Sequence, residues 1–166
     1  FGKTVMANMV SAFFSRGVDS TEIFSKLKIA ESTGYQKHLN THDVIRIDFS
    51  RMPRNCNSYD KYIERIERIL IQDLMEAYPK ADIQEEDAVW DSLDLVYERY
   101  GCQRFIFVFD EWDCIFHKDF ITDEDKKKYI SFLSSLLKDK AYVLLSYMTG
   151  ILPIAKYSSG SELNMF

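Results

Sequence analysis

An unbroken apolar run at residues 105–109 (FIFVF) is the feature that most restricts how this chain can fold. Charged residues bound the run on both sides, a pattern typical of a strand that is buried on both faces of a sheet. The run ends in Asp110 and Glu111. Ligands gather at the carboxyl ends of strands in open parallel sheets, so these two carboxylates are the first candidate site residues.

Other segments of the chain alternate between strand and helix patterns. Residues 44–49 are rich in β-branched side chains, and residues 141–148 form another buried apolar run. Apolar residues at helical spacing predict helices over residues 5–14, 21–29, 62–78, 89–100 and 129–137. This alternation predicts an α/β fold with helices layered around a mostly parallel sheet.

Composition limits the size of the fold and the classes of partner. The 166 residues, 46% of them hydrophobic, suit one domain or part of one. A formal net charge of -5 provides no basic field, so we expect no direct binding to nucleic acid. Cys56, Cys102 and Cys114 are odd in number and widely spaced, which favours free thiols in a reducing cytoplasm. No apolar stretch approaches the roughly 20 residues of a membrane span, so we expect a cytoplasmic protein without membrane contact.

The opening residues Phe1-Gly2-Lys3-Thr4 match the end of a phosphate-binding loop. In such a loop, amides at a helix N-terminus hold phosphate oxygens, a lysine reaches the outer phosphates and a Ser or Thr hydroxyl binds Mg²⁺. Gly2, Lys3 and Thr4 have these types in this order. The triplet alone is weak, because the glycine-rich half of the loop is not in the sequence. An ordinary helix start after Gly2 explains it equally well.

The two acids that end the apolar run suit a Walker B segment. In this interpretation Asp110 contributes to the Mg²⁺ shell and Glu111 polarises an attacking water. Acids at strand ends often only solvate a turn, and that alternative is favoured for the run considered alone. The Gly-Lys-Thr triplet at a helix start reverses the balance, because phosphoryl transfer needs positioned positive charge, a metal and an oriented water.

For other polar residues, the sequence gives weaker evidence of a role in the site. Thr149 ends the third predicted strand, where a γ-phosphate sensor lies in many ATPases, but a cap of the following turn explains it as well. Asp113 is either a further active-site carboxylate or, as we favour, a solvated loop residue. His38 and His42 lack a convincing third ligand, so we expect no metal site there.

Three segments together carry a resemblance to a known family: Phe1-Gly2-Lys3-Thr4, residues 107–113 (FVFDEWD) and residues 149–156 (TGILPIAK). Residues 158–164 agree with it. The combination resembles the bacterial AAA-ATPase-like family over nearly the whole chain, with Trp112 where the family pattern leads us to expect tyrosine. The resemblance implies a three-layer P-loop NTPase core of the AAA-like (ASCE) type, which has an extra strand between the Walker A and Walker B strands.

The resemblance also implies ATP and Mg²⁺ as ligands. Gly2, Lys3 and Thr4 would bind the nucleotide phosphates. Thr4 and Asp110 would hold the metal. The family often carries a restriction-endonuclease-like domain further along the chain, and a homo-oligomer is a further expectation for the full-length protein.

The catalytic residues implied by the resemblance are Glu111, as the carboxylate that activates water, and Thr149, as a sensor by position only. The expected function is ATP binding with Mg²⁺-dependent hydrolysis in the full-length protein. Two alternatives stay open. One is a nucleotide-binding switch for signalling or assembly without turnover, and the other is a structural fragment without activity.

Residues 1–166 would form a partial domain, truncated at the N-terminus and lacking the strand before the phosphate-binding loop. We place that strand between the Walker B strand and the sensor strand. Its loss would leave unpaired backbone groups, each costing on the order of 1–3 kcal/mol if they stay dry. We therefore expect either a gap between residues 105–109 and 141–148 or a direct collapse of one onto the other.

Overall fold

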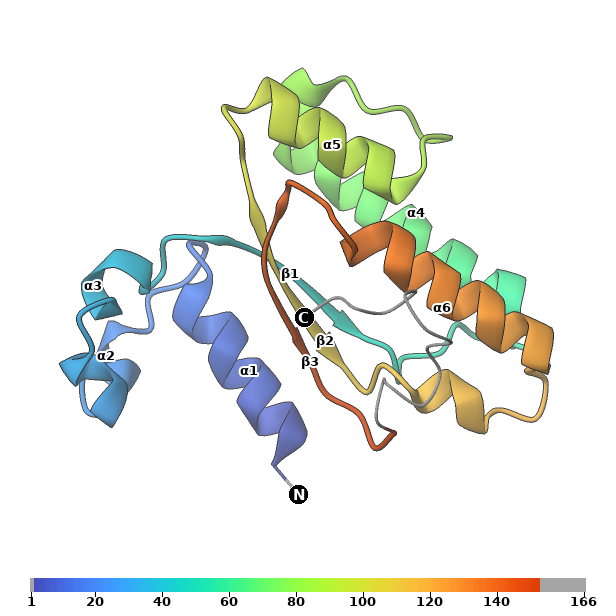
Figure 1. Ribbon diagram of the computed structural model, residues 1–166, viewed down its shortest axis with the longest axis horizontal. Helices are drawn as coiled ribbons and strands as arrows, with labels where there is room; N and C mark the ends of the chain where they lie inside the picture. Colours follow the sequence, from blue (N-terminus) through green and yellow to red (C-terminus); the bar gives the residue numbers. More distant parts are fainter. Residues whose placement is uncertain (1, 153–166) are drawn as a thin grey trace.

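A three-stranded, all-parallel sheet organises the computed structural model, which describes residues 2–152 (Figure 1). The strands are β1 (Asp43–Asp48), β2 (Phe105–Asp110) and β3 (Val143–Met148), in the order β1-β2-β3. The α-helices are α1 (Lys3–Phe14), α2 (Thr21–Phe24), α3 (Tyr35–His38), α4 (Tyr59–Ala77), α5 (Val89–Arg99) and α6 (Asp123–Leu137). Short 3₁₀ segments are η1 (Lys28–Glu31), η2 (Pro79–Ala81) and η3 (Cys114–His117). The predicted α/β class with a parallel sheet is confirmed.

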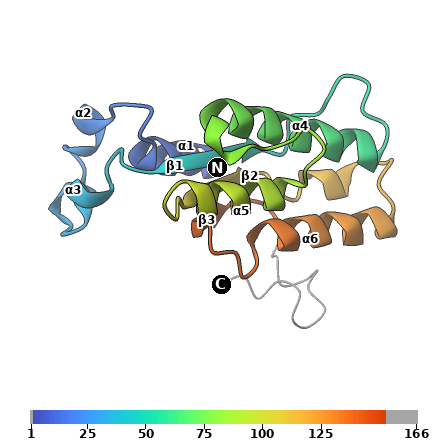
Figure 2. The same ribbon diagram turned by 90° about the horizontal axis from the view of Figure 1, so that it is seen from above.

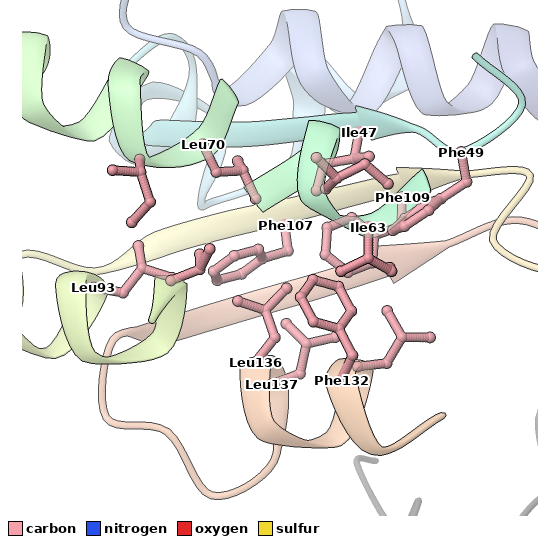
Figure 3. Close-up of a cluster of buried hydrophobic side chains, with 14 of the residues drawn as sticks. Ile47, Phe49, Ile63, Leu70, Leu93, Phe107, Phe109, Phe132, Leu136 and Leu137 are labelled. Atoms are coloured by element: carbon pink, nitrogen blue, oxygen red, sulfur yellow. The ribbon is translucent and has the colours of Figure 1, made fainter. Parts of the chain in front are cut away.

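β2 is the central strand, and each of its residues is buried. Successive side chains of a strand point to opposite faces of the sheet. On one face, Ile106 and Val108 pack with Ala7 of α1. On the other, Phe107 and Phe109 enter the main core beside α4, α5 and α6 (Figure 3). The burial on both faces that the apolar run predicts is therefore confirmed.

Helices cover the two faces of the sheet unequally. α1 lies on one face, and α4, α5 and α6 lie on the other, which gives the predicted three layers (Figure 1). The segment that contains α2 and α3 projects from the end of the sheet, away from α4 and α6 (Figure 2). Phe13, Phe24 and Tyr35 form a small separate core that joins this segment to α1.

The helices begin in different ways. At the start of α4, the Ser58 side chain accepts a hydrogen bond from the Lys61 N–H, and α6 begins with a capping box between Thr122 and Asp125. α1 follows Gly2, whose φ of 94° lies in the left-handed region, and has no side-chain cap. The first amides of α1 are thus left open, unlike those of α4 and α6. None of the helices described within residues 2–152 is both long and apolar enough to cross a bilayer.

The arrangement of β2 and β3 corrects one expectation. The two strands pair directly and in parallel, from Phe105 opposite Val143 to Phe109 opposite Met148, with a single irregularity after Phe105. Neighbouring strands lie about 4.8 Å apart, so a strand placed between them would double their separation. Direct contact is therefore the observed outcome, but the pairing is that of a continuous sheet. The placement of a further strand between β2 and β3 is wrong.

The packing of β2 predicts that Phe107→Ala destabilises the fold by about 3–5 kcal/mol, because truncating a buried aromatic side chain leaves a cavity. Urea unfolding followed by circular dichroism measures this change. The control is Ile23→Ala, since Ile23 is 61% exposed on α2 and its loss should change stability by about 0.5 kcal/mol or less. Equal effects of the two substitutions would contradict the central position of β2.

Candidate functional site

Asp110 and Thr149 lie side by side at the carboxyl end of the sheet. Asp110 is 1% exposed and Thr149 is 6% exposed. The Thr149 hydroxyl donates a hydrogen bond to the Asp110 carboxylate. The Thr149 N–H donates to the Phe109 carbonyl at 2.8 Å, and the Trp112 N–H donates to the Thr149 carbonyl at 3.0 Å. These bonds extend the β2–β3 pairing beyond the strands and fix the two polar side chains together.

Glu111 follows Asp110 with its backbone in the left-handed region, at a φ of 54°. That conformation costs a non-glycine residue on the order of 1–3 kcal/mol. Hydrogen bonds hold it in place: the Glu111 N–H donates to Thr149 Oγ1 at 3.3 Å, and its carbonyl accepts from the Cys114 N–H at 3.0 Å. Glu111 is partly exposed, whereas the preceding Asp110 is buried.

Asp113 is not the solvated loop residue that we favoured from the sequence. It is 1% exposed, and its Oδ2 accepts hydrogen bonds from the N–H groups of Ile151 at 2.8 Å and Leu152 at 2.6 Å. Its carboxylate therefore secures the turn that follows Thr149. The prediction of a solvated position is wrong because the turn after β3 folds over Asp113.

The start of α1 lies at the same edge of the sheet as these acids. The His42 N–H, just before β1, donates to the Phe14 carbonyl at the end of α1 at 2.9 Å. The end of α1 is thus at the amino end of the strands, and α1, about 18 Å long, runs back to their carboxyl end (Figure 1). By the two-residue period of β2, Asp110 falls on the face that α1 covers.

The first turn of α1 has the features of an anion site. Lys3 is partly exposed and Thr4 is exposed, and the turn contains no acidic residue. The first hydrogen bond within the helix is from the Met6 N–H to the Gly2 carbonyl, at 2.9 Å. The amides before Met6 have no intrahelical partner, and they carry the positive end of the helix dipole. Phosphate oxygens suit such a terminus.

The donor set at this edge suits Mg²⁺ bound together with phosphate. Thr4 and Asp110 offer a hydroxyl and a carboxylate, and Mg²⁺ is commonly held by one or two protein oxygens with substrate phosphates and waters. Within residues 2–152, no three His, Cys, Asp or Glu side chains group closely enough to hold a metal by themselves. No hydrogen bond or ion pair joins Lys3 or Thr4 to Asp110 in that same part of the chain. The two halves of the candidate site therefore share an edge without a hydrogen bond or ion pair between these residues.

Two further groups of side chains lie outside this edge. His38 and His42 are joined by a hydrogen bond of 2.9 Å between His38 Nδ1 and His42 Nε2, and their rings stack. Within the described residues no metal cluster includes them. The Cys114 thiol donates to the Phe49 carbonyl at 2.8 Å, and burial raises the pKa of this thiol to about 11. Cys114 is therefore a poor nucleophile at neutral pH.

Three surface cavities, of about 740, 480 and 210 Å³, lie along α4. Their walls come from α4 together with β1, the end of α1 or the loop before α5. None of the three is lined by Lys3, Thr4, Asp110, Glu111 or Thr149. The candidate site is consequently recognised by its chemistry at the strand ends and by the open start of α1, not by cavity volume.

The family follows from comparison with known proteins. A family model described as "Predicted AAA-ATPase" matches residues 1–159. The chain belongs to the AAA-ATPase-like family. No curated protein and no solved structure matches the chain. Membership agrees with the parallel sheet and with the resemblance carried by residues 107–113. Phe1 and residues 153–166, which include residues 158–164 and the second half of residues 149–156, lie outside the described residues.

The candidate site of this AAA-ATPase-like domain contains contacts that the sequence did not predict. The meeting of Asp110 with Thr149 follows from adjacent parallel strand ends, so strand order alone would have indicated it. The bonds from Ile151 and Leu152 to Asp113 span more than thirty residues of sequence, 38 and 39 respectively. The only local signal for them is Gly150, a residue without a side chain that lets the turn approach closely.

The histidine pair predicts acid sensitivity. Burial, and then the neighbouring His38, lower the pKa of His42 in the folded state. An unfolded chain binds this proton with a pKa of about 6.5, so acidification through that value favours unfolding. We expect the free energy of unfolding to decrease as the pH falls below about 6.5, and we expect His42→Gln to lose part of that decrease.

Urea titrations of the wild type and His42→Gln at several pH values measure this effect. The other titrating groups contribute equally to both proteins, so the difference between the two pH profiles reports His42. His117→Gln is the control, since His117 is exposed. Parallel pH profiles for the wild type and His42→Gln would show that the pair does not couple to folding.

Proposed function

We propose that this domain binds ATP with Mg²⁺ and hydrolyses it in the full-length protein. One observation carries the proposal: the uncapped start of α1, with Lys3 and Thr4, lies at the same edge of the sheet as Asp110 and Glu111. Membership of the AAA-ATPase-like family supports the same conclusion.

Phosphate binding is assigned to the first turn of α1. The amides after Gly2 would donate to phosphate oxygens, and the Lys3 ammonium would reach the outer phosphates. Thr4 and Asp110 would hold Mg²⁺, which when bound neutralises charge on the phosphate oxygens. The rest of the chemistry is assigned to Glu111 and Thr149, which directly follow β2 and β3.

Hydrolysis is assigned to Glu111. A water oxygen forms a bond to the γ-phosphorus while the bond from that phosphorus to the bridging oxygen breaks, and its electron pair stays with ADP. Glu111 orients the water and accepts its proton. The partly exposed position of Glu111 beside the buried Asp110 suits this role, because a water molecule has access to it.

Thr149 has a more defined role than its position in the sequence indicates. Its single hydroxyl proton is donated to Asp110, so in this state it orients the proposed metal ligand. Action as a γ-phosphate sensor requires the same proton to turn to a phosphate oxygen. We therefore propose that Thr149 exchanges partners when nucleotide binds.

A nucleotide-dependent switch without turnover is the second candidate. The exchange of partners proposed for Thr149 favours it, since that exchange would respond to bound nucleotide without any bond to phosphorus breaking. The two candidates share the binding residues and differ only in whether Glu111 acts on water. The third possibility is a structural fragment that has no nucleotide-dependent activity. Mg²⁺-dependent binding of ATP would refute it.

We predict that Glu111→Gln in the full-length protein abolishes most ATP hydrolysis while ATP binding stays near the wild-type level. The amide keeps the size of the side chain but cannot accept the proton of water, and loss of such a group typically costs about 10²–10⁴-fold in rate. Phosphate release measures turnover, and fluorescent nucleotide titration measures binding.

Glu124→Gln is the matched control, because Glu124 is exposed on the first turn of α6. Equal hydrolysis by the wild type and Glu111→Gln would remove the catalytic assignment and leave the switch. Absence of hydrolysis in the wild type, with Mg²⁺-dependent binding, would have the same consequence.

We predict that Lys3→Met weakens ATP binding about tenfold or more, which corresponds to about 1.4 kcal/mol of lost interaction with phosphate. Lys28→Met provides the control, because Lys28 is an exposed lysine in η1, away from the start of α1. Nucleotide titration at fixed Mg²⁺ compares the two. An equal affinity for both variants would place the phosphates elsewhere.

A further inference from the structure

Asp113 is a buried carboxylate that the proposed hydrolysis does not use. It stands at the N-terminal cap position of η3, yet its side chain makes no capping hydrogen bond to that segment. Within residues 2–152, its side-chain hydrogen bonds instead cross to the turn after β3, where one oxygen, Oδ2, accepts from the amides of Ile151 and Leu152. The local role expected of an aspartate at a cap is replaced by a long-range one.

The energetics tie Asp113 to this turn. Burial of a carboxylate is costly unless hydrogen bonds or an opposite charge compensate it. Asp113 is 1% exposed and has no ion pair within residues 2–152, so the two amides are its compensation. If the turn moved away, the carboxylate would lose both of these donors. The turn is therefore held by two hydrogen bonds to an ionisable acceptor, which are stronger than bonds between neutral groups.

Gly150 fits this turn closely against the loop after β2. A Cβ atom placed on Gly150 would lie 2.5 Å from Trp112 Nε1 and 2.7 Å from Asp113 Oδ1. Neither distance allows a carbon atom, so a side chain here would push the turn away from Trp112 and Asp113. The absence of a side chain at Gly150 thus lets the turn lie directly against Trp112 and Asp113.

Thr149 directly precedes this turn and bonds to the last residue of β2 through its hydroxyl and to the loop after β2 through its carbonyl. The carbonyl accepts from the Trp112 N–H, and the hydroxyl donates to Asp110. An anchor at Ile151 and Leu152 restricts the backbone of Thr149 on its C-terminal side. The contacts lead without interruption from Asp113, through the turn, to Asp110.

We infer that Asp113 is a positioning residue for the Mg²⁺ site: it fixes the turn at residues 150–152, which holds the Thr149 hydroxyl on Asp110. This inference rests on the proposed function only in naming Asp110 as the metal ligand. It predicts that Asp113 affects the requirement for Mg²⁺, while phosphate binding at Lys3 does not depend on it. Residues that orient a metal ligand typically change metal affinity about 10–100-fold when they are mutated.

The first test needs neither nucleotide nor activity. In the full-length protein, Asp113→Ala should speed hydrogen exchange at the amides of Thr149 and Trp112, as measured by mass spectrometry of the corresponding peptides. Asp113→Asn should restore most of the protection, because its side-chain oxygen can still accept from both amides. Asp119→Ala is the control, since Asp119 is an exposed aspartate in the following loop. Wild-type exchange in Asp113→Ala would overturn the inference.

The second test measures ATP binding as a function of Mg²⁺ concentration. Asp113→Ala should raise the Mg²⁺ concentration for half-maximal binding about tenfold or more, and it should leave metal-free ATP binding unchanged. Gly150→Ala should also raise the Mg²⁺ concentration for half-maximal binding, although it leaves the Asp113 side chain intact. This variant replaces Asp113→Ala in the test if Asp113→Ala does not fold. An unchanged Mg²⁺ requirement in the folded variants would reduce Asp113 to a structural residue and overturn the inference.

The two proposals fail in different ways. Mg²⁺-dependent ATP binding by the wild type, with no shift in either variant, would refute the role of Asp113 alone. A wild type that binds no ATP with Mg²⁺ would refute the proposed function and the metal-positioning role together. Loss of metal-free ATP binding in Asp113→Ala would also count against the inference, because Asp113 would then act on the whole site.

Discussion

Burial of β2 on both faces is the constraint on which the rest of this domain depends. A strand with Phe107 and Phe109 on one side and Ile106 and Val108 on the other cannot face water on either side, so helices have to cover both. α4, α5 and α6 cover the aromatic side and α1 covers the other. The same constraint decides that β2 is central, because an edge strand would expose its backbone as well as its side chains.

The position of the candidate site follows from this packing. α1 contacts the face that carries Ile106 and Val108, and the two-residue period of the strand puts Asp110 on that face. Because α1 runs against the direction of the strands, its positive end and Lys3 come to the edge where the strand acids lie. The packing of α1 against this face of the sheet therefore brings the uncapped helix start and the carboxylates to one edge, although more than a hundred residues separate them in sequence.

Sequence patterns predict the parts of this structure that depend on local hydrophobicity. The apolar run predicts β2, helical spacing predicts α1 and α4, and strand ends predict where Asp110 and Thr149 lie. Strand order is different, since it depends on which backbones pair, and nothing in the apolar pattern of residues 141–148 names β2 as the partner. The burial of Asp113 was missed for a similar reason. Its environment comes from a turn 38 residues away, which the pattern of residues next to Asp113 does not indicate.

Two buried acids lie at and just after the carboxyl end of β2, and the same segment of the chain donates hydrogen bonds to both. Asp110 is held by the Thr149 hydroxyl and Asp113 by the amides of Ile151 and Leu152, and these donors all belong to the segment that ends β3. Neither acid has an ion pair within residues 2–152, so a displacement of that segment would remove these donors from both carboxylates at once. Two charges that depend on one segment make its movement cooperative. The end of β3 is thus expected to move as a unit, and any ligand that competes for the Thr149 hydroxyl acts on both acids through it.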